Sequence, residues 1–232
     1  MRDDFPLLLI PGLACTGALF SAQIAALKSA RAVLVADHAA HDSMGAIAEA
    51  ILAEAPARFH LAGLSMGGYI ALEIMRQAPE RVGRLCLMDT SARADTPEKT
   101  TLRREALAEV AAGRYLEMSR VGLPLTIAAS RGGDDALAEA IMQQARDTGS
   151  EVWTRQTHAI MGRVDSRPDL PAIKAQTLVI VGDEDQVTPP DHAEEMARLI
   201  PDARLEVIGD CGHMSSMERP EQVTALLQEW LA

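Results

Sequence analysis

Ser65 lies in a Gly-x-Ser-x-Gly motif, residues 63–67, and this motif predicts a serine nucleophile for acyl transfer. An apolar run over 59–62 precedes it, and a helical pattern over 69–77 follows it. A serine between a strand and a helix stands on a strained turn, where small neighbours permit close packing. There the backbone N–H of Met66 would point at the negative charge that develops on an attacked carbonyl oxygen.

A serine hydroxyl needs a base, and the base needs an acid that orients it. In a parallel sheet, such groups gather at the carboxyl ends of the strands. His213 follows the last predicted strand, and a histidine transfers protons near neutral pH. Spacing leaves the acid open, because Asp183, Glu184 and Asp185 follow the fifth strand and Asp89 follows the fourth. We expect one of the three in the later loop.

A glycine-rich turn of this kind can instead bind a phosphate group. The dinucleotide fingerprint Gly-x-Gly-x-x-Gly is excluded, because Ser65 takes the place of its second glycine. A P-loop is excluded as well, because no Lys-Ser or Lys-Thr pair follows the glycines. The nucleophile remains the better interpretation of the motif.

The remaining histidines do not predict a second reactive centre. His60 lies in a predicted strand, and His158 and His192 lie on predicted helices. His38 and His41 flank a strand-end loop that also holds acidic residues, but no further cluster supports a metal site there. We therefore expect no metal ion and no organic cofactor.

Short apolar runs alternate with helical patterns along most of the chain, which predicts a parallel sheet with helices on both faces. The expected fold is α/β, with six mainly parallel strands. The predicted strands are 7–10, 33–36, 59–62, 84–88, 177–181 and 204–208, and the predicted helices between and after them are 19–27, 44–53, 69–77, 191–200 and 220–231.

The alternation stops between about residues 92 and 171, where no convincing strand is found. Four helical patterns fill this segment, at 97–112, 114–121, 134–147 and 150–162. We interpret residues 92–171 as a helical cap, inserted into a core of residues 1–91 and 172–232 and laid over the edge of the sheet where the loops meet.

Composition limits the classes of partner. The 232 residues carry a net charge of -11, which argues against binding to nucleic acid or to an anionic membrane surface. Three cysteines are too few for a disulfide framework. The N-terminus lacks the pattern of a signal peptide, and no apolar run is long enough to span a bilayer. We expect a cytoplasmic protein that acts on a small molecule.

Three motifs, in order along the chain, resemble the α/β-hydrolase fold superfamily over nearly the whole length. The serine motif is the first. Residues 182–189 resemble its Gly-x-x-Asp-x-x-Thr-Pro, and residues 212–220 resemble its Gly-His…Glu-x-Pro ending. Within the superfamily, the sequence is similar to cofactor-free serine hydrolases with a helical cap, such as small carboxylesterases, enol-lactonases and perhydrolase-like enzymes. The resemblance implies that Asp185 is the acid.

The resemblance also implies an oxyanion hole. The family has His-Gly-x after its first parallel strand, where x donates a second N–H, and this chain has Pro-Gly-Leu at residues 11–13. The backbone of Leu13 would then join that of Met66. The side chains of Leu13, Met66 and Met214 would flank the serine and form an apolar acyl pocket.

Together these residues predict a serine hydrolase, and a carboxylesterase for small to medium esters is the activity we expect. A serine in place of an aspartate disfavours the dehalogenase and epoxide hydrolase branches. A lactonase or a carbon–carbon bond hydrolase would use the same triad. A hydrolase of carrier-bound methyl esters would use basic cap residues among Arg103, Arg104 and Arg114. A hydrolase-like receptor that binds a ligand without turnover is the non-enzyme alternative.

Overall fold

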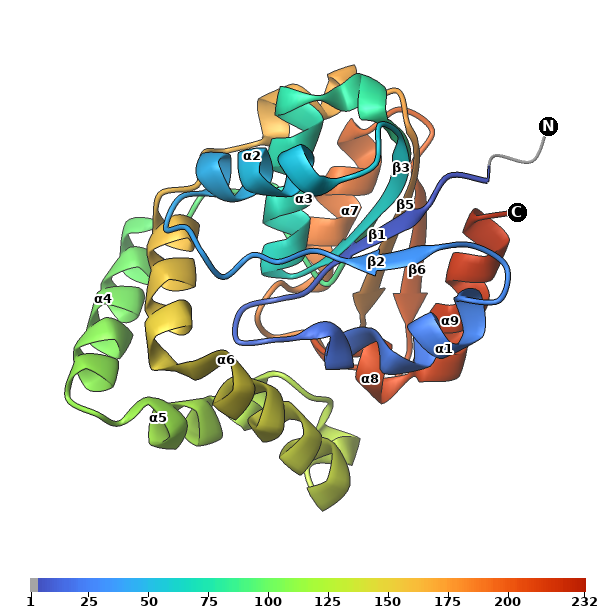
Figure 1. The fold of residues 1–232 in the computed structure, drawn as a ribbon. Coiled ribbons are helices and arrows are strands. Elements are labelled where there is room, and N and C mark those ends of the chain that lie inside the picture. The colour runs from blue at the N-terminus through green and yellow to red at the C-terminus, as the bar shows by residue number, and fades with distance from the viewer. Residues whose placement is uncertain (1–3) are drawn as a thin grey trace.

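The computed structural model describes residues 4–232 and contains one sheet of six strands (Figure 1). The strand order is β2-β1-β3-β4-β5-β6, and every neighbouring pair is parallel. The predicted α/β fold with six parallel strands is therefore confirmed. The strands are β1 (Leu7–Ile10), β2 (Val33–Val35), β3 (Phe59–Leu64), β4 (Val82–Met88), β5 (Gln176–Gly182) and β6 (Arg204–Ile208).

Helices follow the strands as the apolar pattern predicts, with one short addition. A four-residue helix, Ser215–Glu218, begins two residues after His213 and was not predicted, because four residues carry no periodic signal. The α-helices are α1 (Ser21–Leu27), α2 (Met44–Glu54), α3 (Met66–Gln77), α4 (Pro97–Ala111), α5 (Tyr115–Gly122), α6 (Asp135–Met161), α7 (Pro190–Leu199), α8 (Ser215–Glu218) and α9 (Pro220–Trp230).

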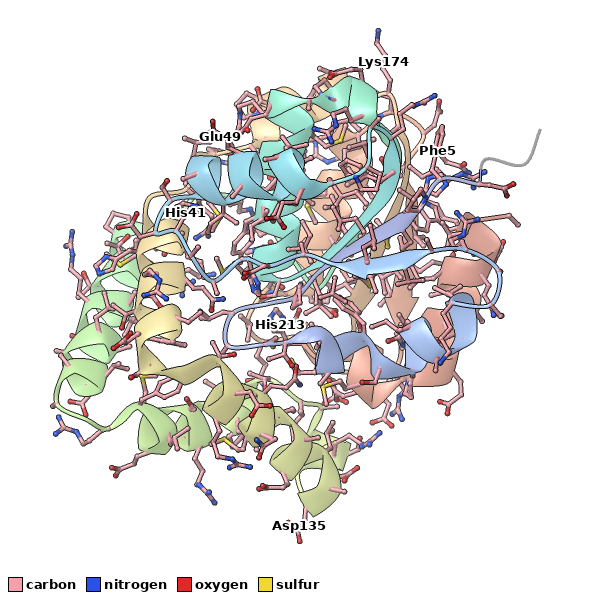
Figure 2. The ribbon with its side chains drawn as sticks, viewed as in Figure 1. Phe5, His41, Glu49, Asp135, Lys174 and His213 are labelled. Carbon is pink, nitrogen blue, oxygen red and sulfur yellow. The ribbon has the colours of Figure 1, made fainter. Side chains whose placement is uncertain are left out.

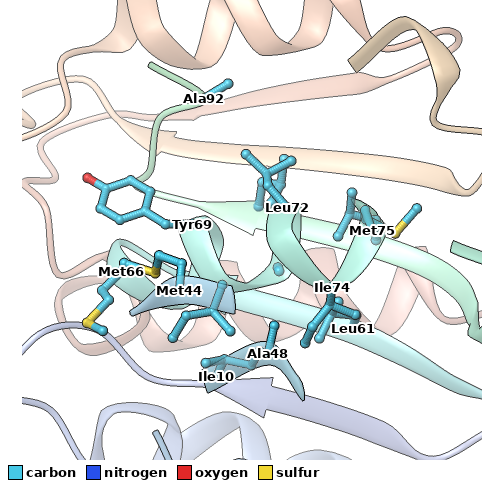
Figure 3. Packing of buried hydrophobic residues seen from close by; sticks show 14 of the residues in the cluster. Ile10, Met44, Ala48, Leu61, Met66, Tyr69, Leu72, Ile74, Met75 and Ala92 are labelled. Carbon is cyan, nitrogen blue, oxygen red and sulfur yellow. The ribbon is translucent and has the colours of Figure 1, made fainter. Parts of the chain in front are cut away.

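The two faces of the sheet bury different sets of side chains. Leu8 and Ile10 of β1 pack with α2, α3 and α7 on one face. Leu7 and Leu9, which alternate with them, pack with α1 and α9 on the other face. Figure 3 shows part of the first cluster, in which side chains of α2 and α3 pack with those of β1 and β3. Burial on both faces explains why the central strands β1, β3 and β5 are nearly continuous apolar runs in the sequence.

Between β4 and β5 the described chain holds helices only, and α4, α5 and α6 lie together beside the sheet (Figure 1). The two helices predicted at 134–147 and 150–162 are confirmed; they share the label α6 and meet at a kink at Gly149, where the backbone is not helical, with a φ of 75° and a ψ of 162°. A glycine reaches this positive φ without the penalty that a side chain would bring. We keep 92–171 as the proposed bounds of the cap.

None of the helices in residues 4–232 combines the length and the apolar character that a membrane-crossing segment needs.

Arg81, just before β4, binds the chain where α2 ends. Its guanidinium donates hydrogen bonds to the carbonyl oxygens of Leu52, Ala55 and Pro56, each at 2.9 Å, and to that of Ala57 at 3.3 Å. The last carbonyls of a helix have no intrahelical partner, and a cation also complements the negative end of the helix dipole. Arg81 thus fixes α2 to the start of a central strand.

We expect Arg81→Met to lower the free energy of unfolding by about 2–3 kcal/mol, because four carbonyl groups, three of them in partly buried bonds, lose a charged donor. Urea unfolding followed by circular dichroism measures this change. Arg198→Met, which removes an exposed arginine from α7, is the matched control and should shift stability by less than about 0.5 kcal/mol. Equal effects in the two variants would contradict a structural role for the Arg81 contacts.

Candidate active site

The backbone at Ser65 is held in a strained conformation between β3 and α3. Its φ is 56° and its ψ is -116°, a region that a serine rarely adopts. Two bonds to the end of β4 keep it there. The Ser65 N–H donates to the carbonyl oxygen of Met88 at 2.9 Å, and the Thr90 hydroxyl donates to the carbonyl oxygen of Ser65 at 2.7 Å. The strain is therefore supported from the neighbouring strand.

The glycines of the motif are required by close contacts. A Cβ at Gly63 would lie 2.2 Å from the carbonyl oxygen of Gly67, and one at Gly67 would lie 2.0 Å from that of Ile10. A Cβ at Gly68 would lie 2.4 Å from the hydroxyl oxygen of Thr90. No side chain fits at these distances, so the sequence pattern follows from the packing of β1, β3 and α3.

Three of the predicted residues form a chain of hydrogen bonds. The hydroxyl oxygen of Ser65 lies 2.8 Å from Nε2 of His213, and Nδ1 of His213 lies 2.8 Å from Oδ2 of Asp185. The backbone N–H groups of Val187 and Thr188 donate to Oδ1 of Asp185 at 2.8 and 2.9 Å. Since a carboxylate accepts only, the proton on His213 lies on Nδ1, and Nε2 is free to accept the serine proton.

The other two acidic residues of the same loop brace neighbouring loops. Asp183 accepts the N–H of Cys211 at 3.2 Å, and Glu184 accepts the N–H of Ala129 at 2.9 Å. Neither forms a hydrogen bond with His213. Of the three candidates that spacing left open, Asp185 is the one that reaches the histidine.

Asp89, the fourth candidate, is fully buried beneath the site. It accepts the N–H of Gly182 at 3.1 Å and is hydrogen-bonded to the hydroxyl group of Ser215. These bonds tie the ends of β4 and β5 to the start of α8. Burial, together with the charge of Asp185, raises the pKa of Asp89 above its ordinary value.

Glu218 holds the loop that carries His213, and sequence reasoning gave it no role. Its Oε1 accepts the N–H groups of Gly212 and Met214 at 3.0 and 3.1 Å, and its Oε2 accepts the N–H of Ala128 at 2.8 Å. The glutamate of the Gly-His…Glu-x-Pro pattern was the signal that could have identified it. It fixes the residues on either side of the histidine.

The charges around the histidine favour its protonated form. Burial of the ring disfavours a charge, but the nearby Asp185 carboxylate, assisted by Asp89 and Glu218, outweighs burial and raises the pKa of His213 above 6.5. Burial likewise opposes ionisation of Asp185, yet His213 and the donors of Thr188 lower its pKa below the ordinary value. The pair is arranged to stabilise an imidazolium once the histidine has taken a proton.

The loop after β1 lies against the serine turn. A Cβ placed on Gly12 would be 3.4 Å from both the carbonyl oxygen of Leu64 and the Cβ of Ser65. Leu13 follows in the chain. Met66 is the first residue of α3, so its N–H has no acceptor within the helix. The two backbone segments expected to donate to an oxyanion thus lie beside the serine.

The side chain of His38 binds the loop that follows β1. Its Nε2 lies 3.1 Å from the carbonyl oxygen of Gly12, so Nε2 carries the proton. Burial lowers the pKa of His38 and keeps the ring neutral.

A second cavity, of about 380 Å³, lies at the outer edge of the sheet, and His38, His41 and Asp37 are among the residues that line it. No group of three or more metal-binding side chains is found within residues 4–232.

The cap also binds the loop that follows β1. The side-chain oxygen of Gln156 accepts the N–H of Ala14 at 3.1 Å, and that of Gln144 accepts the N–H of Thr16 at 3.1 Å. Both glutamines are buried and lie in α6 on either side of the kink at Gly149. Ala14 has a φ of 58°, so the loop is strained where the cap binds it. No motif in the sequence indicated these residues.

A cavity of about 540 Å³ opens at the serine between the core and the cap. Figure 2 places His213 between the sheet and the cap helices. Leu13 and Met214 line the cavity as predicted. The prediction for the side chain of Met66 is corrected, because it is fully buried in the core under α3 (Figure 3). The cap supplies a mostly apolar wall that includes Leu102, Met118, Leu123, Leu125, Ile141 and Trp153.

Comparison with known proteins gives one consistent family. A family model described as the alpha/beta hydrolase family matches residues 7–226. The chain is 31% identical over 191 residues to a pimeloyl-(acyl-carrier protein) methyl ester esterase of Nitrosomonas europaea, with 78% of this chain and 74% of that protein covered.

Two solved structures are close in shape. A thermophilic esterase from Thermogutta terrifontis has a TM-score of 0.89 and 31% identity, with 98% of this chain and 89% of that chain covered. An enol-lactonase from Burkholderia xenovorans has a TM-score of 0.88 and 25% identity, with 99% and 92% covered. With the family model matched from β1 to α9, the chain belongs to the alpha/beta hydrolase family.

Proposed function

We propose that this protein is a serine hydrolase whose preferred substrates are small to medium carboxylic esters. One observation carries the proposal, namely the unbroken chain from Ser65 through His213 to Asp185 at the mouth of a mostly apolar cavity of about 540 Å³. Two similar proteins are named as esterases, which supports an ester bond as the target. A small-molecule partner and a cytoplasmic location stay predictions from the sequence.

In the proposed mechanism, the hydroxyl oxygen of Ser65 attacks the ester carbonyl carbon while Nε2 of His213 takes the proton. Asp185 keeps the imidazole in the required tautomer and stabilises the imidazolium. The N–H groups of Leu13 and Met66 donate to the oxyanion, and one such donor contributes about 2.7–4 kcal/mol. His213 then protonates the leaving alcohol.

The acyl group remains on Ser65 as an ester after the alcohol leaves. Water enters, His213 takes one of its protons, and the resulting hydroxide attacks the acyl carbon. Return of that proton to the serine oxygen releases the carboxylic acid. No step requires a group beyond the triad and the two backbone donors.

Lactone opening is the second candidate, because the enol-lactonase is similar over 99% of this chain. For a carrier-bound methyl ester, only one of the three arginines proposed for the carrier faces the cavity. Arg103 lines it, whereas Arg104 is exposed and Arg114 is paired with Glu109 on the surface. A receptor would bind its ligand without turnover, so a measurement of hydrolysis distinguishes it from the three enzyme candidates.

We expect Ser65→Ala to lose about 10⁴-fold to 10⁶-fold in kcat on p-nitrophenyl esters, because it removes the nucleophile. Hydrolysis is measured across acyl lengths for wild type and variant. Ser29→Ala changes an exposed serine after α1 and serves as the matched control with wild-type activity. Equal activity of wild type and Ser65→Ala would overturn the mechanism.

The pH dependence of kcat/KM tests the base. His213 must be neutral to accept the serine proton. We therefore expect kcat/KM to rise with pH through the pKa that His213 has in the free enzyme. Because that pKa is raised, we expect the midpoint of the rise above pH 6.5. Asp185→Asn removes the carboxylate that raises it, so the midpoint moves down and kcat falls about 10⁴-fold.

Asp42→Asn, which removes an exposed carboxylate, is the control for the pH profile. It should leave the midpoint in place. A midpoint at or below pH 6.5 in wild type, or one that Asp185→Asn does not move, would contradict the assignment of His213 as the base oriented by Asp185.

The glutamines of the cap should position the Leu13 N–H. We expect Gln144→Leu or Gln156→Leu to lower kcat about tenfold to a hundredfold, since a displaced donor loses part of its contribution to oxyanion stabilisation. Binding of a trifluoromethyl ketone, which forms an oxyanion on the serine, should weaken in parallel while KM changes little. Gln143→Leu alters the exposed neighbour in α6 and is the control. Unchanged binding of the ketone would refute the positioning role.

A further inference from the structure

One face of α4 brings positive charge to the cavity of the serine. Lys99, Leu102, Arg103 and Ala106 follow the i, i+3, i+4, i+7 spacing of a single helix face, and all four line the cavity. Two of the four are cationic. The rest of the cavity wall is mostly apolar, so this face carries its main charged groups.

The two arginines near this face share a single carboxylate. Arg103 forms an ion pair with Asp95 at 2.6 Å, and Arg163 pairs with the other oxygen of Asp95 at 2.7 Å. The side chain of Asp95 is only 1% exposed. One buried negative charge therefore pairs with two guanidinium groups.

Lys99 has no such partner. Within residues 4–232, its ammonium group forms no hydrogen bond and no ion pair, although the residue is half-buried. Burial lowers the pKa of Lys99, and the charges of Arg163 and Arg103 lower it further, while Asp95 opposes them. The Lys99–Arg103 pair is also a like-charge i,i+4 pair, which destabilises a helix. This corner of the cavity thus carries an unneutralised positive charge.

An anion beside Lys99 would remove this imbalance. A carboxylate suits the site, because one singly charged ammonium is available while both guanidinium groups are already paired with Asp95. A dianionic phosphate would find one unpaired cation here. The anion would share the cavity with Ser65, so it can belong to the molecule that the serine attacks.

We propose that Lys99 binds a free carboxylate of the substrate, so that the preferred substrate is an ester or lactone bearing a second, ionised carboxyl group. This inference rests on the proposed function, since it names the substrate class of the same site. The carboxylate can lie in the acyl part or in the alcohol part, and matched substrates distinguish the two.

The test compares substrates of equal length with and without the carboxylate. For the acyl part, monomethyl adipate is paired with methyl hexanoate, and monomethyl suberate with methyl octanoate. For the alcohol part, the butyrate ester of glycolic acid is paired with propyl butyrate. The readout is the ratio of the two kcat/KM values within each pair, which does not depend on the fraction of active enzyme.

We expect wild type to favour the carboxylate-bearing ester in one of the two sets. Lys99→Met should lower that ratio about tenfold to a hundredfold, as for the loss of a hydrogen bond to a charged group. Lys99→Arg should retain most of the preference because it keeps the charge. The control, Lys174→Met, removes an exposed lysine at the end of the molecule away from the cap and should keep the wild-type ratio (Figure 2).

Failure of this inference is distinguishable from failure of the proposed function. Ester turnover without a preference in wild type, or with the same ratio in Lys99→Met, would overturn the carboxylate site and leave the esterase proposal standing. If wild type hydrolyses none of the esters, the carboxylate site is tested without turnover. Titration calorimetry then measures the binding of adipate and of hexanoate to wild type and to Lys99→Met. Binding of adipate that is lost in Lys99→Met would support the site, and equal binding of the two acids would overturn it.

Discussion

The contact between Gly67 and the carbonyl oxygen of Ile10 is the constraint on which the site depends. A Cβ at Gly67 would lie 2.0 Å from that oxygen, so the start of α3 and the end of β1 touch with no side chain between them. This approach forces Ser65 into its strained turn and brings the loop after β1 beside the serine. The end of β4 then supports the strain through Met88 and Thr90. Segments from three adjacent strands thus meet at Ser65, and a packing requirement sets the position of the proposed nucleophile.

Around this point, carboxylates organise the loops at the same edge of the sheet. Asp89, Asp183 and Glu218 each accept backbone N–H groups from the segment that leads to or follows His213. Buried polar groups must be paired, and these pairs fix loops that have no regular hydrogen bonds of their own. Asp89 and Glu218 also raise the pKa of His213 together with Asp185. The residues that hold the histidine in place therefore also help to set its basicity.

The sequence predicted the strands and the serine well because both depend on local pattern. The continuous apolar runs of the central strands follow from burial on both faces, and Ser65 and His213 were identified by their positions at strand ends. Spacing could not choose among Asp183, Glu184 and Asp185, because the choice depends on side-chain direction within one tight loop. The side chain of Met66 was misplaced for a similar reason, since the first turn of α3 points it into the core. Gln144 and Gln156 accept hydrogen bonds from residues more than a hundred positions away in the chain, and no local sequence pattern predicts such a contact.

The cap contributes to the site in two ways that are physically linked. Through α6 it binds the strained loop at Ala14 and Thr16, and through α4 it brings Lys99 into the cavity of Ser65. Helices α4, α5 and α6 contact one another around Val110, Tyr115 and Trp153, and Leu13 packs against this cluster. A shift of the cap would therefore move the wall that meets the substrate and the loop that carries the Leu13 N–H together. In the proposed mechanism, recognition of the substrate and stabilisation of the oxyanion would depend on the same packed helices, so the cap would couple the two properties.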